Sequence, residues 1–399
     1  MKQALLDTLG HWLPDMTDIR RSIHAWPELA FQEVRTADTV ARLLESWGIA
    51  VHRGLGTTGV VGSIVGRGPG RAVGLRADMD ALPMPEANTF AHASQNPGVM
   101  HACGHDGHTT MLLAAARYLA EQRDFNGTVH VLFQPAEEGG GGARRMIEDG
   151  LFTQFPMDAV FGMHNWPGLP VGTFGLTEGP IMASSNRFNI TLQGKGAHGA
   201  MPHLGVDPVV AAAQLTLAFQ TILTRNKDPL DAGVISVTQI HTGSADNVIP
   251  DQAVLRGTVR TLDDAVLDLI EARMRALSTQ LAAAMGCTAD FHFSREYPAT
   301  LNHPAETALC TEVLTGLVGT EHVQTAVRPS MGAEDFAFML QQRPGCYVWI
   351  GNGTGDHRTP GHGAGPCTLH NSSYDFNDAL IPLGAAYWVL LAQRALQAD

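Results

Sequence analysis

The sequence has 399 residues, 44% of them hydrophobic, which is more than one hydrophobic core usually supports and argues for two domains. Its 26 basic and 39 acidic residues give a net charge of -13 without any basic run, which argues against nucleic acid or an anionic membrane as a partner. The five cysteines are odd in number and widely spaced, which favours a reducing compartment, the cytoplasm, over a secreted disulfide framework.

The first 184 residues alternate between predicted helices and short apolar strands. Helical spacing of apolar residues runs from Asp15 to Trp47, with a turn at Trp26–Glu28. Two more helices are expected at residues 109–121 and 143–149. The expected strands cover residues 59–65, 72–77, 128–133 and 159–163. This alternation predicts an α/β fold with a mostly parallel sheet covered by helices on both faces.

Polar residues follow the carboxyl ends of three of these strands. Asp80 comes after the second strand, Glu137 and Glu138 come after the third, and His164 comes directly after the fourth. Open α/β sheets bind their ligands at this edge. The sequence therefore predicts a functional site there.

The middle of the chain, residues 185–297, has a different pattern. Its predicted elements follow the order βαββαβ, with strands at 187–193, 234–241, 254–261 and 288–293 and helices at 208–223 and 264–285. This order is ferredoxin-like and complete in itself, so we expect an inserted domain. The catalytic domain is then discontinuous and consists of residues 1–184 and 298–399. Its second part has predicted helices near 304–318 and 378–398 and a strand at 347–350.

The stretch His101–His108 holds more candidate metal ligands than any other part of the chain. Cys103 and His105 offer a thiolate and an imidazole two residues apart, and Gly104 between them lets the backbone turn tightly. The helix that follows places this cluster at a helix N-terminus. On this stretch alone, a redox or structural cysteine beside incidental histidines remains an alternative.

The pair Glu137-Glu138 suits two different roles, because neighbours on an irregular segment point in different directions. One carboxylate can bind a metal ion while the other takes a proton from a water that the metal has acidified. A solvated acidic turn is the alternative. The following four glycines lack a Lys-Ser/Thr pair and are no phosphate loop. His164 and His370 are each weak evidence as single residues.

Several segments together resemble those of dinuclear metallo-amidohydrolases, the family of bacterial hippurate hydrolases, N-acyl-amino-acid deacylases and plant auxin-conjugate hydrolases. They occur in family order over nearly the whole chain. They are LRADMDALPM, MHACGHDGHTTMLL, FQPAEEGGGGA, GMHNWP, GKGAHGAMPH, NVIPDQAVLRGTVR, MGAEDFAFML and the late His370.

The resemblance implies two divalent metal ions, a general base at Glu137, and a role for Asp80 in steadying a metal-binding histidine. The implied metal ligands are Cys103, His105, Glu138, His164 and His370. In the wider peptidase superfamily an aspartate bridges the metals where this chain has Cys103, which leaves the metal and the bridging ligand open. A thiolate favours zinc, while related enzymes also use manganese, cobalt or nickel.

The resemblance also implies that the inserted domain is a lid and dimerisation domain. His198 matches a histidine that stabilises the tetrahedral oxyanion, and Asn247 matches a residue that assists it, often from the partner subunit. Arg260 matches an arginine that holds the substrate's free carboxylate, with an ordinary salt bridge as the alternative. Glu334 matches a position near the active site, without a role that the sequence assigns.

We therefore expect metal-dependent hydrolysis of the amide bond of an N-acyl or N-aroyl amino acid. The expected partners are this small-molecule substrate and a second copy of the chain. One alternative keeps the site and changes the function to a dipeptidase or carboxypeptidase acting on small peptides. Another is a non-catalytic metal-binding protein that kept the fold, against which the intact Glu137 and His198 argue.

Overall fold

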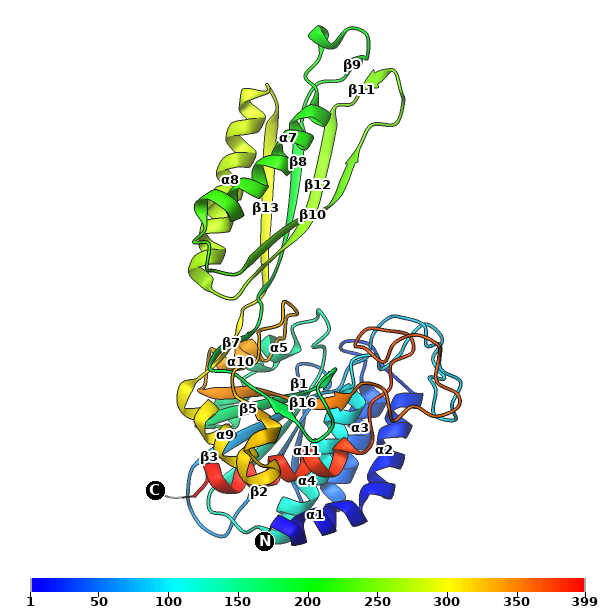
Figure 1. The fold of residues 1–399 in the computed structure, drawn as a ribbon, viewed down its shortest axis with the longest axis vertical. Coiled ribbons are helices and arrows are strands. Elements are labelled where there is room, and N and C mark those ends of the chain that lie inside the picture. The colour runs from blue at the N-terminus through cyan, green and yellow to red at the C-terminus, as the bar shows by residue number, and fades with distance from the viewer. Residues whose placement is uncertain (1, 398–399) are drawn as a thin grey trace. The chain divides into compact units, whose positions relative to one another are not determined.

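The computed structural model describes residues 2–397 and divides into two compact units. Unit 1 contains the chain up to Ile181, the segment Leu301–Arg328 and the chain from Asp335 onward. Unit 2 contains Met182–Thr300 and Pro329–Glu334, so it is inserted into unit 1 along the chain (Figure 1).

In the described part of the chain, eight strands form the central sheet of unit 1. These strands are Ala50–Leu55 (β1), Gly59–Val65 (β2), Ala72–Asp78 (β3), Thr128–Gln134 (β4), Ala159–Pro167 (β5), Phe174–Gly175 (β6), Val323–Gln324 (β15) and Gly345–Gly353 (β16). Their order is β1-β2-β4-β3-β5-β16-β6-β15. The central strands β4, β3, β5 and β16 run parallel, while β1, β2 and β6 are antiparallel to their inner neighbours. The predicted mostly parallel sheet is thus confirmed, with antiparallel pairs toward its edges.

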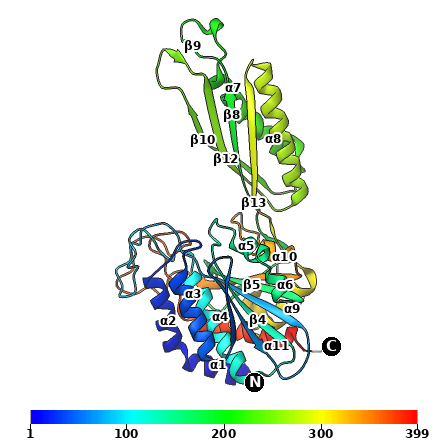
Figure 2. The same cartoon turned by 180° about the vertical axis from the view of Figure 1, so that it is seen from behind.

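Helices cover both faces of this sheet (Figures 1 and 2). They are Lys2–His11 (α1), Leu13–Ala25 (α2), Val34–Ser46 (α3), His105–Gln122 (α4), Gly142–Glu148 (α5), Leu151–Gln154 (α6), Pro304–Val318 (α9), Ala337–Leu340 (α10) and Leu380–Ala395 (α11). α3, α4, α9 and α11 pack on one face, and α5 and α10 lie on the other. A short ribbon pairs Gly179–Met182 (β7) with Thr300–Asn302 (β14).

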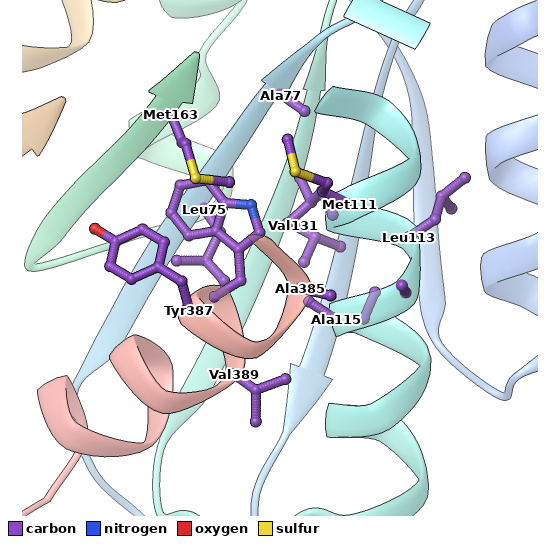
Figure 3. Close-up of a cluster of buried hydrophobic side chains, with 14 of the residues drawn as sticks. Leu75, Ala77, Met111, Leu113, Ala115, Val131, Met163, Ala385, Tyr387 and Val389 are labelled. Atoms are coloured by element: carbon purple, nitrogen blue, oxygen red, sulfur yellow. The ribbon is translucent and has the colours of Figure 1, made fainter. Parts of the chain in front are cut away.

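The main core lies between the sheet and the helices α4 and α11 (Figure 3). Leu75 and Ala77 alternate along β3 so that both face this core, as the period of two in a strand requires. Met111 of α4 meets α11 at Gly384, where a Cβ would lie 2.1 Å from the methionine sulfur. Each large apolar side chain buried in this way contributes roughly 1.5 to 3 kcal/mol. The packing fixes α4, and with it His105 at the N-terminus of this helix.

Unit 2 has its own sheet and core. Its strands are Ser185–Gln193 (β8), Gly233–Thr242 (β10), Gln252–Thr261 (β12) and Thr288–Tyr297 (β13), and its helices are Pro208–Thr221 (α7) and Asp264–Ala284 (α8). The chain follows the order βαββαβ, and the antiparallel strands stand in the order β10-β12-β8-β13. Both helices pack on one face of this sheet. The side chains of Asp207 and Asp263 accept hydrogen bonds at the first turns of these two helices.

The structure corrects one predicted placement and extends several elements. His164 lies inside β5 and not after it, because β16 pairs with β5 from Val160 to Pro167 and so prolongs the strand. α1 and β1 were not predicted; α1 buries only Leu5 and Leu9, which is too little for a periodic signal. The helix predicted at 378–398 is observed as α11, and residue 398 lies outside the described residues. None of the described helices combines the length and apolar character needed to span a membrane.

Candidate metal centre

Six side chains from four separate segments of unit 1 converge on one place. Their potential ligand atoms form overlapping groups in which all atoms lie within 4.8 Å of one another: Cys103, His105 and His164; Cys103, Glu138 and His370; and His105, Glu137 and Glu138. The tertiary structure therefore brings the predicted ligands and the predicted base together from positions 103 to 370.

Gly104 shapes the turn between Cys103 and His105 and begins α4 with a left-handed backbone, φ 95°. A side chain could not be added there, because a Cβ would lie 2.2 Å from the Asn165 amide oxygen and 2.5 Å from the Tyr374 hydroxyl. Glycine tolerates both the backbone angle and this close approach. The two flanking side chains are both buried in the same small volume.

Asp80 connects two of the candidate ligands. His105 Nδ1 lies 3.2 Å from Asp80 Oδ1, and Asp80 Oδ2 accepts the backbone N–H of Glu138 at 2.9 Å. The first contact is the predicted one between Asp80 and a histidine. It fixes the ring so that Nε2 is the free ligand nitrogen, which is how carboxylates commonly support metal-binding histidines. The sequence did not predict the second contact, between Asp80 and the backbone of Glu138. Through the two contacts together, the Asp80 carboxylate orients the segment of His105 and the segment of Glu138.

His164 is oriented by the chain next to it. Its Nδ1 donates to the carbonyl oxygen of Asn165 at 2.6 Å, which leaves Nε2 3.4 Å from Sγ of Cys103. Burial lowers the pKa of His164 well below its ordinary value, so the ring is neutral and offers a lone pair.

Asp78 and His108 also belong to this region, and the sequence analysis did not single them out. His108 Nδ1 lies 2.6 Å from Asp78 Oδ1, and Nε2 lies 2.6 Å from Asn165 Oδ1. Burial opposes ionisation of Asp78, but the nearby His105 and His108 outweigh it and hold the pKa of this carboxyl well below its usual range. The signal was present in LRADMD, where Asp78 precedes Asp80 by two residues, and in the histidine-rich stretch itself.

His370 enters the site from the last part of the chain. Its backbone N–H donates to the Ala102 carbonyl at 2.8 Å, and its φ of 59° is unusual for a residue other than glycine. Its Nε2 lies 3.1 Å from Glu138 Oε1, and this carboxylate raises the pKa of His370. Unlike the other members, His370 is exposed, so the site has an open side there.

The donor set fits divalent cations. His105 Nε2 is buried, makes no hydrogen bond to any described residue, and lies 3.8 Å from Asp78 Oδ2 and 4.0 Å from Glu138 Oε1. Burial and the neighbouring Glu138 and Glu137 raise the pKa of the Cys103 thiol well above its ordinary value, so a thiolate here needs a cation beside it. A thiolate, imidazoles and a carboxylate are ligands that zinc and similar metals prefer.

Asp335, next to Glu334 in MGAEDF, is a buried supporting residue that the sequence analysis missed. It accepts hydrogen bonds from Arg76 Nη2 at 3.0 Å, from Gln134 Nε2 at 2.8 Å and from the backbone of Ala143 at 2.9 Å. It therefore holds the end of β4 and the start of α5, the two ends of the segment that carries Glu137 and Glu138. Glu334 itself is buried and clusters with unit 2.

His198 and Asn247 lie close together in unit 2: His198 ends the strand Ala197–His198 (β9), and Asn247 directly precedes its partner strand Val248–Ile249 (β11). His198 pairs with Val248, and the N–H of Gly199 donates to the Asn247 carbonyl at 2.7 Å. Both predicted side chains are exposed. Both side chains are therefore free to contact a molecule that binds against this ribbon.

Arg260 stands near the other end of β12. Its guanidinium donates to the Thr258 hydroxyl and to the Val259 carbonyl, and burial lowers its pKa. Among the described residues it forms no salt bridge, although the charge of the Glu296 carboxylate opposes this lowering of its pKa. It lines a hollow of about 750 Å³ on the sheet face of unit 2, together with Arg187 and Arg256.

The sequence profile of peptidase family M20/M25/M40 matches residues 74–394. The chain belongs to this family. It is 41% identical to a hippurate hydrolase from Campylobacter jejuni, over 98% of both chains, and 40% identical to thermostable carboxypeptidase 1 from Saccharolobus solfataricus, over 94% of both. Among solved structures, the YXEP protein of Bacillus subtilis, a dinuclear metal binding peptidase from the M20 family, is 34% identical with a TM-score of 0.83, over 97% of this chain and 99% of that one.

Membership in the M20 family accounts for the motifs in both units. The profile spans the segments that carry every one of the converging side chains and also those of His198, Asn247 and Arg260. The resemblance found from the motifs alone is thereby confirmed, and the chain is an enzyme of the metal-dependent hydrolase type.

Proposed function

We propose that this protein hydrolyses the amide bond of N-acyl or N-aroyl amino acids, releasing a carboxylic acid and a free amino acid. The observation that carries the proposal is the convergence of five candidate ligands with one further carboxylate, Glu137, at a single place that is open on the side of His370. The hippurate hydrolase that is 41% identical supports this substrate class.

Two divalent metal ions are the proposed cofactors. The proposed ligands are Cys103, His105, Glu138, His164 and His370. The thiolate favours zinc over manganese, cobalt or nickel. When bound, such ions acidify a water molecule and polarise the amide carbonyl. If Cys103 is a ligand, loading the apo protein with metal should protect its thiol from alkylation; an equal alkylation rate with and without metal would argue against it.

Glu137 is the proposed general base. Its carboxylate lies within 4.8 Å of ligand atoms of His105 and Glu138, where it can take a proton from the attacking water and pass it to the leaving amine nitrogen. His198 and Asn247 donate hydrogen bonds to the oxyanion that develops on the carbonyl oxygen. Arg260 binds the free carboxylate of the substrate through its guanidinium fork.

We also propose that the site is completed across a homodimer. From Gln252, near the ribbon that bears His198, to Arg260, β12 spans about 26 Å at 3.3 Å per residue. The scissile carbonyl and the carboxylate of an N-acyl amino acid are only a few bonds apart. One unit 2 therefore cannot supply both His198 and Arg260 to the same substrate, and a partner subunit must provide one of them.

The surface of unit 2 supports self-association. Val210 and Leu217 on α7 are 51% and 66% exposed, Leu204 just before this helix is 56% exposed, and β10 is an edge strand. Apolar side chains gathered beside an open strand edge are typical of an interface. In this proposal residues 185–297 form the lid and dimerisation domain, between catalytic parts 1–184 and 298–399, and the division into two compact units supports it. The five free, buried cysteines support a cytoplasmic location.

A mixing experiment tests the dimer. The variants His198→Ala and Glu137→Gln should each be inactive, and exchange of their subunits should restore part of the activity, because one site of the hybrid has both an intact base and an intact His198. No recovery after demonstrated exchange would place His198 in its own chain's site or outside catalysis.

A carboxypeptidase acting on small peptides is the second candidate, favoured by the carboxypeptidase that is 40% identical. A single screen separates the two. N-acetyl, N-benzoyl and long-chain acyl amino acids are compared with dipeptides in the presence of zinc, manganese or cobalt. We expect the highest kcat/KM on an N-acyl or N-aroyl amino acid. Turnover of peptides alone would favour the second candidate, and no turnover of either would favour a non-catalytic protein.

A further inference from the structure

Glu33 is a buried carboxylate that lies just before α3 and contacts the segment bearing Glu137. Its exposed fraction is 0%. Oε1 accepts the backbone N–H of Ala136 at 2.9 Å, and Oε2 accepts the Thr58 hydroxyl at 2.6 Å. Both carboxyl oxygens are thus engaged, and one of them holds the residue immediately before Glu137.

The segment that follows β4 needs such support. Ala136 has a φ of 55°, a left-handed conformation that residues with a Cβ seldom adopt and that persists only where the surroundings enforce it. The chain then folds back on itself, because the Ala136 carbonyl accepts the N–H of Gly142 at 3.1 Å. A Cβ at Gly142 would lie 1.7 Å from the Pro135 carbonyl oxygen. The conformation of Ala136 sets the direction in which the next side chain leaves the backbone.

Three carboxylates each accept a hydrogen bond from a different backbone N–H of the segment from Ala136 to Ala143. Asp80 accepts the N–H of Glu138 at 2.9 Å, and Asp335 accepts the N–H of Ala143 at 2.9 Å. Glu33 is the partner of Ala136. The candidate ligand Glu138 therefore has a support of its own, while the backbone just before Glu137 depends on Glu33.

We propose that Glu33 is a positioning residue for Glu137: by holding the amide of Ala136, it aims the Glu137 carboxylate at the reacting water. This inference rests on the proposed function, in which Glu137 is the general base. Glu33 acts through the backbone amide of Ala136, to which its carboxylate is hydrogen-bonded.

The chemistry of the contact indicates which substitution should be tolerated. Burial raises the pKa of Glu33 to about 7, although the hydrogen bond from Thr58 opposes this shift, so the carboxyl group is present in both forms near neutral pH. Either form keeps an acceptor oxygen for Ala136. A glutamine keeps the same acceptor and can donate to the Thr58 hydroxyl, whereas alanine removes the contact and aspartate withdraws the carboxyl by one methylene.

The test compares Glu33→Ala, Glu33→Asp and Glu33→Gln in kcat, KM, metal content and, in metal-free protein, hydrogen exchange of the Ala136 amide. We expect Glu33→Ala to lower kcat about 10- to 100-fold, the loss that a small misplacement of a catalytic group produces, with KM and metal content near the wild-type values. The Ala136 amide should exchange faster. Glu33→Gln should restore kcat and protection, and Glu33→Asp should fall between.

Glu28→Ala is the matched control. Glu28 is a nearby carboxylate that caps α3, accepting the N–H groups of Arg35 and Thr36 at 2.9 and 2.8 Å. Its loss should destabilise the same helix without lowering kcat. An equal loss of kcat in Glu28→Ala would overturn the proposal, as would wild-type kcat in Glu33→Ala or, if that variant does not fold, in Glu33→Asp. A wild-type protein inactive on all N-acyl amino acids would overturn the proposed function instead, while the exchange of Ala136 in metal-free protein would still report on the contact.

Discussion

The two units hold their candidate functional residues in opposite ways. In unit 1 the converging side chains have buried partners within the same unit. Asp80, for example, is the partner of both the His105 ring and the Glu138 backbone. In unit 2, His198 and Asn247 are exposed in or next to a ribbon of two short strands, and Arg260 makes no ion pair with any described residue. A preorganised site avoids reorganisation during the reaction, whereas exposed groups act only when something else is brought to them. We propose on this basis that unit 1 carries the metal ligands and the base, and that unit 2 carries the groups that bind the substrate and its oxyanion.

The largest effect is expected in unit 1, at the base. Glu137→Gln should keep its metal content, because the amide has the same shape and Glu137 is not a proposed ligand. Turnover should fall roughly 10²- to 10⁴-fold, the usual contribution of general-base catalysis. Elemental analysis beside steady-state kinetics checks both statements. Near-normal turnover in this variant would show that Glu137 is not the general base. The proposed difference between the two units would then lose its main support.

The next effect concerns selection by unit 2. Arg260→Ala should lower kcat/KM on an N-acyl amino acid about 30- to several-thousand-fold, corresponding to about 2 to 5 kcal/mol for a truncated charge pair. On the matching amide or methyl ester, where the charged partner is already missing, the same substitution should change kcat/KM little. Equal losses on both substrates would point to a structural role for Arg260.

A smaller effect is expected at the carboxylate that supports the ligands. Asp80→Ala should weaken metal binding about 10- to 100-fold, as loss of a ligand's supporting carboxylate usually does, because His105 and Glu138 would both lose their orientation. Asp251→Ala is the control in unit 2, where Asp251 holds the backbone of Gly196 at 2.7 Å. Competition with a chelator measures both. Equal weakening in the two variants would mean that Asp80 acts only on stability.

The last effect concerns stability and pH. Burial opposes the charging of His24, but Asp106 and Glu86, at 2.9 and 3.1 Å, outweigh it and raise its pKa from 6.5 to about 10. Because the folded state binds this proton more tightly, the stabilisation is complete below pH 6.5 and is lost as pH rises toward 10, by up to about 1.4 kcal/mol per pH unit.

Denaturant titrations at pH 7 and pH 9.5 test this sign. His24→Gln should show a flatter loss of unfolding free energy between the two pH values than the wild type. His292→Gln, at an exposed histidine 3.0 Å from Asp290 in unit 2, should leave the wild-type slope unchanged. The same slope in His24→Gln as in the wild type would contradict a buried, charged His24 in unit 1.

Local pattern alone predicted most of the strands, whereas the full set of candidate ligands was implied only by the family resemblance. The largely apolar run of residues 59–65, which includes one polar residue, Ser63, predicted β2 with its observed bounds, because a strand that is buried over most of both faces is mostly apolar. The spacing of Cys103, Gly104 and His105 indicated a turn with two donors, since short-range geometry depends only on neighbouring residues. The motif order was enough to identify the family.

Only the tertiary structure decided which carboxylates other than Asp80 support the site. Glu33, Asp78 and Asp335 lie far apart in the sequence, and their roles follow from contacts with Ala136, His108 and Arg76 that exist only in the folded chain. His164 lies inside β5, and not after it as predicted, because β16, more than 180 residues later in the chain, extends the strand pairing beyond His164. Local sequence encodes donors and periodicity, whereas the supporting contacts join residues distant in sequence, so chain packing alone determines them.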